Sequence, residues 1–264
     1  MSDFLEAVLL GIVQGLTEFL PVSSSGHLEI MKFILGDNAT GEQSLLMTVV
    51  LHFATASATV YVFRKDVSQL ISTSLSSKLN QAHHYMGKII VSMIPAVLAG
   101  LLLEDMIEAM YNQQLVLVGV SLLITAVLLM VADRARHTND EVTYGQALLI
   151  GIAQAVAIIP GISRSGATIS TSVLLKVDRD QAARFSFLMV VPLIFGKMVK
   201  DLLDGVIRWD TSLLTLAAGF VASFVVGICA CIWMIKIVRR AQLKYFGWYC
   251  IVAGVVAMFF GKLV

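Results

Sequence analysis

Long apolar runs separated by short polar segments dominate the chain. A helix needs about 20 predominantly apolar residues to cross a bilayer. Six segments approach or exceed that length: 44–63, 87–103, 115–132, 184–200, 212–236 and 245–262. The pattern therefore predicts an all-α polytopic membrane protein with six spanning helices.

Two further apolar stretches, 4–19 and 143–159, are too short to cross. The first would extend about 24 Å as a helix. A proline and a polar turn interrupt each stretch, and a second short apolar piece follows, at 27–35 and 167–175. Half-length helices joined by a polar turn are tolerated in a membrane only where protein or water surrounds the turn. We therefore expect two re-entrant hairpins, at 4–35 and 143–175.

The two hairpins are copies of one another. The stretch "AVLLGIVQGLTEFLPVSSSGHLEI" from Ala7 aligns with "ALLIGIAQAVAIIPGISRSGATIS" from Ala147 at a constant offset. Three predicted spans follow each copy, and an odd number of crossings inverts the second copy. The sequence thus predicts an inverted-topology repeat, with halves 1–135 and 141–264. Such repeats commonly place a site at the midplane between broken helices.

Composition agrees with a membrane protein and excludes other classes. Hydrophobic residues make up 58% of the 264 residues and charged residues 14%, whereas soluble domains carry roughly a quarter charged residues. The net charge of +1 gives no nucleic-acid signal. The three cysteines all lie in apolar segments, so we expect buried thiols.

Basic residues predict the orientation. Segments 64–88, 133–142, 176–184 and 236–244 share one predicted side and carry thirteen Lys and Arg residues. The other side carries four: Lys197, Lys200, Arg208 and Lys262. By the positive-inside rule the first side is cytoplasmic. Both termini then lie outside, the first hairpin enters from outside, the second enters from the cytoplasm, and their tips meet.

The meeting point gathers polar and ionisable side chains, which inside a membrane are functional candidates by default. The first hairpin offers Gln14, Glu18, Ser23, Ser24, Ser25 and His27, and the second offers Ser163, Arg164, Ser165 and Thr168. The planar fork of Arg164 suits a phosphate or carboxylate. It precedes a helix start at Gly166, where free amides and the helix dipole favour an anion. Together these features predict a phosphate site.

Simpler interpretations remain open at this point. Turn serines often satisfy only local backbone groups, and Arg164 with Glu18 would also make a buried ion pair. We expect His52, inside a span, to be a helix–helix hydrogen-bond partner. A lipid-phosphate flippase or anion transporter also uses midplane half-helices, and a purely structural subunit would need none of these polar residues.

Two motifs resemble one known family. "QGLTEFLPVSSSGH" is similar to the glutamate-or-glutamine-x-x-x-glutamate motif of the undecaprenyl pyrophosphate phosphatase family, the bacitracin-resistance type. "PGISRSGAT" matches that family's proline-glycine-x-serine-arginine-serine-x-x-threonine motif at every fixed position. The resemblance implies hydrolysis of undecaprenyl pyrophosphate to the monophosphate carrier of cell-wall synthesis. It also implies a periplasmic active-site opening in the bacterial inner membrane, surrounding membrane lipids, and a divalent cation (magnesium or calcium).

The resemblance also implies roles for individual residues. The catalytic set would be Glu18, Ser24, His27 and Arg164, and the phosphate-binding set Ser23, Ser25, Ser163, Ser165, Gly166 and Thr168. Glu18 and Gln14 would hold the cation, although Gln14 stands where many members have Glu, which weakens a metal or base role there. Either Ser24 attacks with His27 as its base, or Glu18 or His27 activates water. The sequence leaves the oligomeric state open, including a homodimer.

Overall fold

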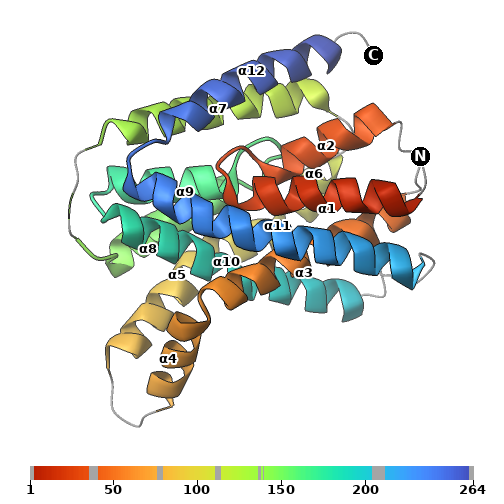
Figure 1. Ribbon diagram of the computed structural model, residues 1–264. Coiled ribbons are helices and arrows are strands. Elements are labelled where there is room, and N and C mark those ends of the chain that lie inside the picture. The colour runs from red at the N-terminus through yellow and green to blue at the C-terminus, as the bar shows by residue number, and fades with distance from the viewer. Residues whose placement is uncertain are drawn as a thin grey trace.

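The computed structural model describes residues 3–35, 41–75, 80–110, 114–135, 138, 140–203 and 212–261. Within these ranges the regular elements are helices, labelled α1 to α12 (Figure 1). Six of them coincide with the six predicted spans: α3 (Gly41–Val62), α5 (Gln81–Leu102), α7 (Leu115–Asp133), α10 (Arg179–Leu203), α11 (Leu213–Arg239) and α12 (Lys244–Gly261). The predicted all-α fold is confirmed.

Five of these helices are long and apolar enough to cross a membrane by themselves. The sixth, α3, qualifies only together with α4 (Arg64–Ser74), from which it is bent by 77°. The apolar pattern did not reveal α4, which has no buried residue, or the short α6 (Glu104–Met110). The protein is a multi-pass membrane protein.

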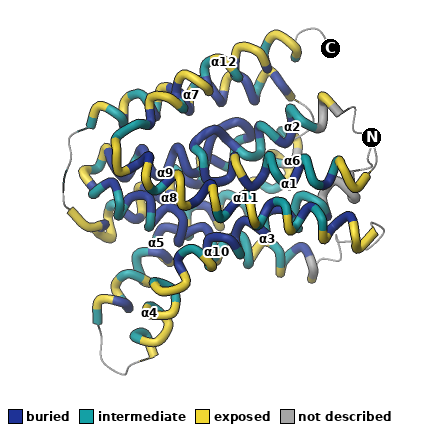
Figure 2. The backbone as a smooth tube through the Cα atoms, in the orientation of Figure 1, coloured by how far each residue is buried: buried dark blue, intermediate teal, exposed yellow. Residues whose placement is uncertain are grey.

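Each predicted hairpin is a pair of short helices. The first pair is α1 (Asp3–Phe19) with α2 (Ser24–Leu35), and the second is α8 (Tyr144–Val156) with α9 (Arg164–Leu174). The two pairs enter the molecule from opposite sides (Figure 1). The loops that join them are largely buried near the centre (Figure 2), as a polar turn at membrane depth requires.

Each hairpin packs against a span from the other half of the chain. Helix α1 lies along α11, α8 lies along α5, and α7 pairs with α12. The repeat-matched glycines Gly11 and Gly151 make these contacts close. A Cβ atom at Gly11 would lie 3.0 Å from the Cβ of Ala222, and one at Gly151 would lie 2.9 Å from the Cα of Ser92. Glycine at these positions lets two helix backbones approach closely.

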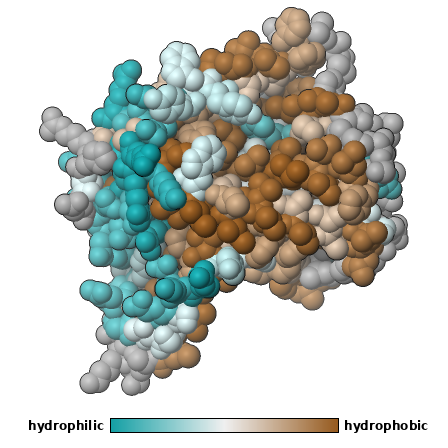
Figure 3. Space-filling view, in the orientation of Figure 1, coloured by the Kyte–Doolittle hydropathy of each residue, from teal (hydrophilic) through white to brown (hydrophobic). Residues whose placement is uncertain are grey.

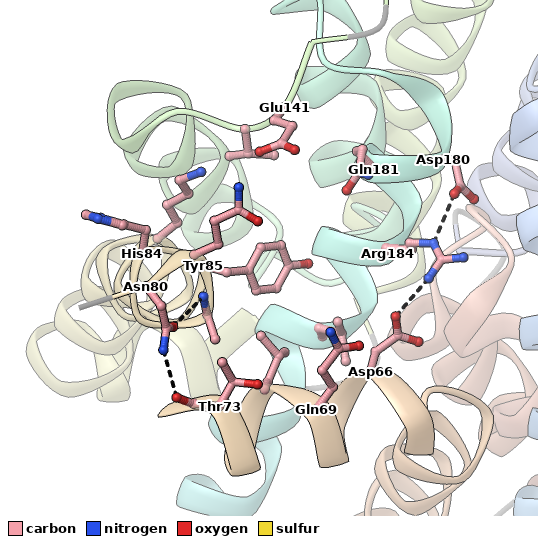
Figure 4. Close-up of a pocket in the computed structure, with 16 residues that line it drawn as sticks. Asp66, Gln69, Thr73, Asn80, His84, Tyr85, Glu141, Asp180, Gln181 and Arg184 are labelled. Carbon is pink, nitrogen blue, oxygen red and sulfur yellow. Dashed lines mark hydrogen bonds and ion pairs between the residues drawn. The ribbon is translucent and has the colours of Figure 1, made fainter. Parts of the chain in front are cut away.

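The predicted cytoplasmic segments gather on one side of the molecule, where hydrophilic residues are concentrated in Figure 3. Arg184 of α10 contacts Asp66 of α4 at 3.0 Å and Asp180 at 2.9 Å, and Arg239 of α11 contacts Asp180 at 2.7 Å. Arg184 and both of its carboxylate partners border a polar cavity of about 760 Å³ between α4, α5 and α10 (Figure 4). These contacts confirm that segments 64–88, 176–184 and 236–244 share one side.

On the opposite side, Lys200 at the end of α10 forms an ion pair with Glu104 of α6 at 2.7 Å. Four of the basic residues that were counted for the orientation lie outside the described residues: Lys78, Arg136, Arg208 and Lys262.

The cysteine prediction is correct in part. Cys231 and Cys250 are buried, but Cys229 is exposed on α11. An apolar segment of the sequence did not distinguish the exposed face of this helix from its buried face.

Candidate active site

The tips of the two hairpins meet, as the repeat predicted. The Arg164 guanidinium, at the start of α9, forms an ion pair with Glu18, at the end of α1, through Nη2 and Oε1. The Ser165 hydroxyl donates a hydrogen bond to the Leu20 carbonyl at 3.3 Å. The side chains of Glu18 and Arg164 are only 8% and 16% exposed. A charged pair therefore sits in the interior, between segments that are far apart in the sequence.

The second carboxylate oxygen of Glu18 binds two side chains of the same hairpin. Oε2 accepts a hydrogen bond from the Ser24 hydroxyl at 2.7 Å and another from Gln14 Nε2 at 3.0 Å. Gln14 and Glu18 are four residues apart on α1 and so share one helix face. Ser24 thus has a carboxylate acceptor for its proton, in the geometry of a nucleophile beside a base.

His27 lies elsewhere than expected. Its Nδ1 is 2.8 Å from the Ser23 carbonyl, and its Nε2 is 2.7 Å from the Tyr249 hydroxyl of α12. The His27 and Tyr249 rings are stacked, with centroids 5.6 Å apart. The expected Ser24–His27 pairing is not formed, because Ser24 bonds to Glu18 and the histidine, one helical turn further along α2, faces α12.

Arg164 has a second anchor that the sequence did not reveal. Its Nη1 donates to the Ser186 carbonyl of α10 at 3.3 Å, and the Ser186 hydroxyl lies 2.6 Å from the Thr168 hydroxyl. Thr168 and Ser186 are fully buried. Ser186 was missed because a single serine in an apolar span has no motif around it.

His52 of α3 also reaches the site, which corrects the expectation of a helix–helix hydrogen bond. Its Nδ1 bonds within α3 to the Thr48 carbonyl at 2.8 Å, and its Nε2 lies 3.9 Å from Glu18 Oε2. The signal that could have identified it was its position, because an ionisable residue inside a span is a functional candidate by default.

The turn serines have equivalent geometry in the two hairpins. Ser23 and Ser25 share a contact of 3.3 Å between hydroxyls, as do Ser163 and Ser165. The Gly26 amide donates to the Ser23 hydroxyl at 3.2 Å, and the Gly166 amide donates to the Ser163 hydroxyl at 3.1 Å. The Gly166 amide, expected to be free for an anion, is therefore used in a helix cap. These serines hold the turns, and phosphate binding by them stays a prediction.

Oxygen ligands for a hard cation are present but few. Gln14 Oε1 is buried without a hydrogen-bond partner beside the Glu18 carboxylate. The described residues contain no group of three His, Cys, Asp or Glu side chains that could hold a metal. Magnesium is commonly held by one or two carboxylates together with substrate phosphates. The donors therefore fit a cation whose coordination the substrate completes.

The sequence of this chain is similar to those of known proteins. Residues 7–256 match the family model described as bacitracin resistance protein BacA. A protein of Christiangramia forsetii named undecaprenyl-diphosphatase is 56% identical over 98% of each chain. Proteins of the same name from Parabacteroides distasonis and Methanosphaera stadtmanae are 43% and 35% identical, again over 98% of each chain. The chain belongs to the bacitracin resistance protein BacA family.

Proposed function

We propose that this protein hydrolyses undecaprenyl pyrophosphate to undecaprenyl phosphate and inorganic phosphate. The observation that carries the proposal is the chain of contacts from Arg164 through Glu18 to Ser24 at the meeting point of the hairpins. It is supported by relatives named undecaprenyl-diphosphatase that match nearly the whole chain.

Arg164 binds the diphosphate. Its fork exchanges the Glu18 carboxylate for two phosphate oxygens, and such bidentate pairs are among the strong charge-assisted hydrogen bonds. Thr168 and Ser186 hold the arginine from behind through their mutual hydrogen bond and the Ser186 carbonyl. The Glu18 carboxylate, released from Arg164, is then free to accept a proton.

Ser24 is the nucleophile. Its Oγ forms a bond to the terminal phosphorus while Glu18 takes the hydroxyl proton across the 2.7 Å hydrogen bond. The bond from that phosphorus to the bridging oxygen breaks, and undecaprenyl phosphate leaves. Water then attacks the phosphorus of the phosphoserine, and the bond from phosphorus to Ser24 Oγ breaks. Glu18 returns its proton to that oxygen, and inorganic phosphate departs with the protons of the attacking water.

A divalent cation, when bound, neutralises charge on the diphosphate, which is the main requirement of phosphoryl transfer. Gln14 Oε1 and the Glu18 carboxylate would hold it. The proposed reaction uses residues of one chain only. It therefore does not require a homodimer, which the sequence left open.

The protein acts in the bacterial inner membrane as an inverted repeat, with both termini and the active-site opening on the periplasmic side. The orientation is supported by thirteen Lys and Arg residues on the predicted cytoplasmic side against four on the other side. Each hairpin packs on a span of the other half, α1 on α11 and α8 on α5, which supports a two-fold relation between the halves.

The test is release of inorganic phosphate from undecaprenyl pyrophosphate by detergent-purified protein. We expect turnover that a chelator abolishes and added magnesium or calcium restores. Stopping the reaction early should leave phosphate on Ser24, detected by mass spectrometry. No phosphate release would favour a transporter, because transport has no readout without a membrane. Turnover without phosphoserine would favour direct attack by water.

A further inference from the structure

A groove of about 530 Å³ lies between the tip of α1, the last turns of α11 and the first turns of α12. Apolar and aromatic side chains form most of its lining, namely Leu16, Leu20, Trp233, Ile237, Tyr245 and Tyr249. Its volume lies within the range of roughly 300–1,000 Å³ typical of sites for small ligands. The proposed reaction makes no use of this groove.

The groove opens toward lipid. Trp233 and Tyr245 are 51% and 61% exposed, and both belong to helices that qualify as membrane spans. Tryptophan and tyrosine are enriched where a protein meets the polar boundary of a bilayer. A hydrocarbon chain is therefore the ligand chemistry that this lining suits.

The outer end of the groove is cationic. The Lys244 ammonium lies 5.5 Å from the centre of the Tyr245 ring, and Arg240 directly follows the last residue of α11. Both side chains are exposed. Their neighbour Arg239 is already paired with Asp180 at 2.7 Å. Lys244 thus lies beside a lining residue, and Arg240 precedes the lining residue Gln242 by two positions; these two cations complement a lipid with an anionic head group.

The inner end reaches the first hairpin. Tyr249 lies four residues beyond Tyr245, about 6 Å deeper along α12, and its hydroxyl is the partner of His27 at 2.7 Å. A chain that fills the groove would pack against the residue that holds this histidine.

We propose that the groove binds one acyl chain of an anionic phospholipid, whose phosphate lies between Arg240 and Lys244. A phospholipid is favoured as the occupant because exposed cations at a bilayer surface attract anionic lipids. The site is separate from Glu18, Ser24 and Arg164, and it does not depend on the proposed hydrolysis.

The test uses the full-length protein in nanodiscs of equimolar phosphatidylglycerol and phosphatidylcholine, with retained lipid identified by native mass spectrometry. We expect phosphatidylglycerol to be retained over phosphatidylcholine by about tenfold or more, since two cations contribute. The double variant Arg240→Gln/Lys244→Gln should lose at least about fivefold of that preference. Leu16→Trp, which fills the groove without removing a charge, should abolish retention of either lipid.

Matched controls separate the groove from the general surface. Trp233→Ala should lower retention, whereas Trp248→Ala should not, because Trp248 is 62% exposed on α12 but does not line the groove. Lys65→Gln should leave the preference unchanged. Size-exclusion and thermal-unfolding profiles verify that each variant is folded.

Equal retention of the two phospholipids, or retention that survives Leu16→Trp, would overturn the proposal. Displacement of phosphatidylglycerol by equimolar polyprenyl phosphate, with that lipid retained instead, would assign the groove to an isoprenoid chain and also overturn it. Since lipid retention is measured without turnover, failure here is distinguishable from failure of the proposed hydrolysis.

Discussion

Glu18 connects three helices by itself. It pairs with Arg164 of α9, accepts a hydrogen bond from the Ser24 hydroxyl of α2, and faces His52 of α3. Buried ion pairs are weak sources of stability, because desolvation offsets much of their attraction. In the proposed reaction Arg164 exchanges Glu18 for the diphosphate, so the charge of the arginine would remain compensated with and without substrate.

Replacing Arg164 with Lys should lower kcat/KM at least about tenfold, equivalent to about 1.4 kcal/mol in the barrier. Lysine keeps the charge but offers a point charge in place of a bidentate fork. Steady-state phosphate release measures the effect. Arg239→Lys is the matched control, since Arg239 pairs with Asp180 at the polar surface. Near-wild-type turnover in folded Arg164→Lys protein would mean that the fork is not used.

Ser24 and Glu18 should behave as one catalytic unit. Ser24→Ala and Glu18→Gln should each lower kcat by about 10²–10⁴-fold, the range of proton-transfer catalysis. The double variant should cost little more than the worse single variant, because groups that act together are non-additive. If the two losses in kcat multiplied in the double variant, Ser24 and Glu18 would not act as a pair. His27→Ala with Ser24→Ala is the comparison cycle, because those two side chains are not bonded to each other.

His52 should contribute although it lies outside both motifs. We expect His52→Ala to lower kcat about tenfold by removing the imidazole that faces Glu18 Oε2 at 3.9 Å, a step of about 1.4 kcal/mol. His52→Gln should recover part of the loss, since its amide keeps an N–H group facing that oxygen. His84→Ala is the control, because His84 contacts Tyr144 on the polar side. Equal activity of the His52→Ala and His84→Ala proteins would remove His52 from the site.

At the scale of elements, the short helices depend on the spans beside them. Helices α1 and α8 end inside the molecule, so their polar turns need protein around them. Close packing supplies it, with α1 on α11 and α8 on α5. The hairpins are therefore stabilised by contacts with the other half of the chain rather than by their own length.

Gly151→Ala should destabilise the protein by about 1–3 kcal/mol, the usual cost of overpacking. The new Cβ would meet the Ser92 backbone of α5. Gly145→Ala, on the same helix, should be neutral or stabilising because nothing lies within 4 Å of its Cβ position and alanine favours helix. Thermal unfolding in one detergent compares the two. A Gly151→Ala protein as stable as Gly145→Ala would show that α8 can move away from α5 without cost.

At the scale of the whole molecule, the site belongs to neither half alone. Glu18 and Ser24 come from the first half, and Arg164 and Ser186 come from the second. Basic segments collect on one face, where Arg184 connects α4 to α10. The two faces thus differ in charge, which is the feature that sets orientation in a bilayer.

Orientation can be tested by labelling with a membrane-impermeant maleimide in spheroplasts of a variant that lacks the native cysteines. Asp105→Cys, exposed on α6, should be labelled from outside. Ser68→Cys, exposed on α4, should be labelled only after lysis. The reverse pattern would place the basic face outside and contradict the proposed topology.

The sequence by itself determined the six long helices, the two hairpins and the meeting of the hairpin tips. Apolar length decides which segments can cross a bilayer, and a repeated polar turn has few structures available at that depth. The meeting of the tips predicted Glu18 and Arg164 as a possible ion pair, and the family resemblance added Ser24 to the same site. Only the tertiary structure decided that Ser24 bonds to Glu18 while His27 bonds to Tyr249, and that His52 and Ser186 join the site. Sequence spacing relates side chains within one helix, whereas contacts between helices depend on how distant segments pack.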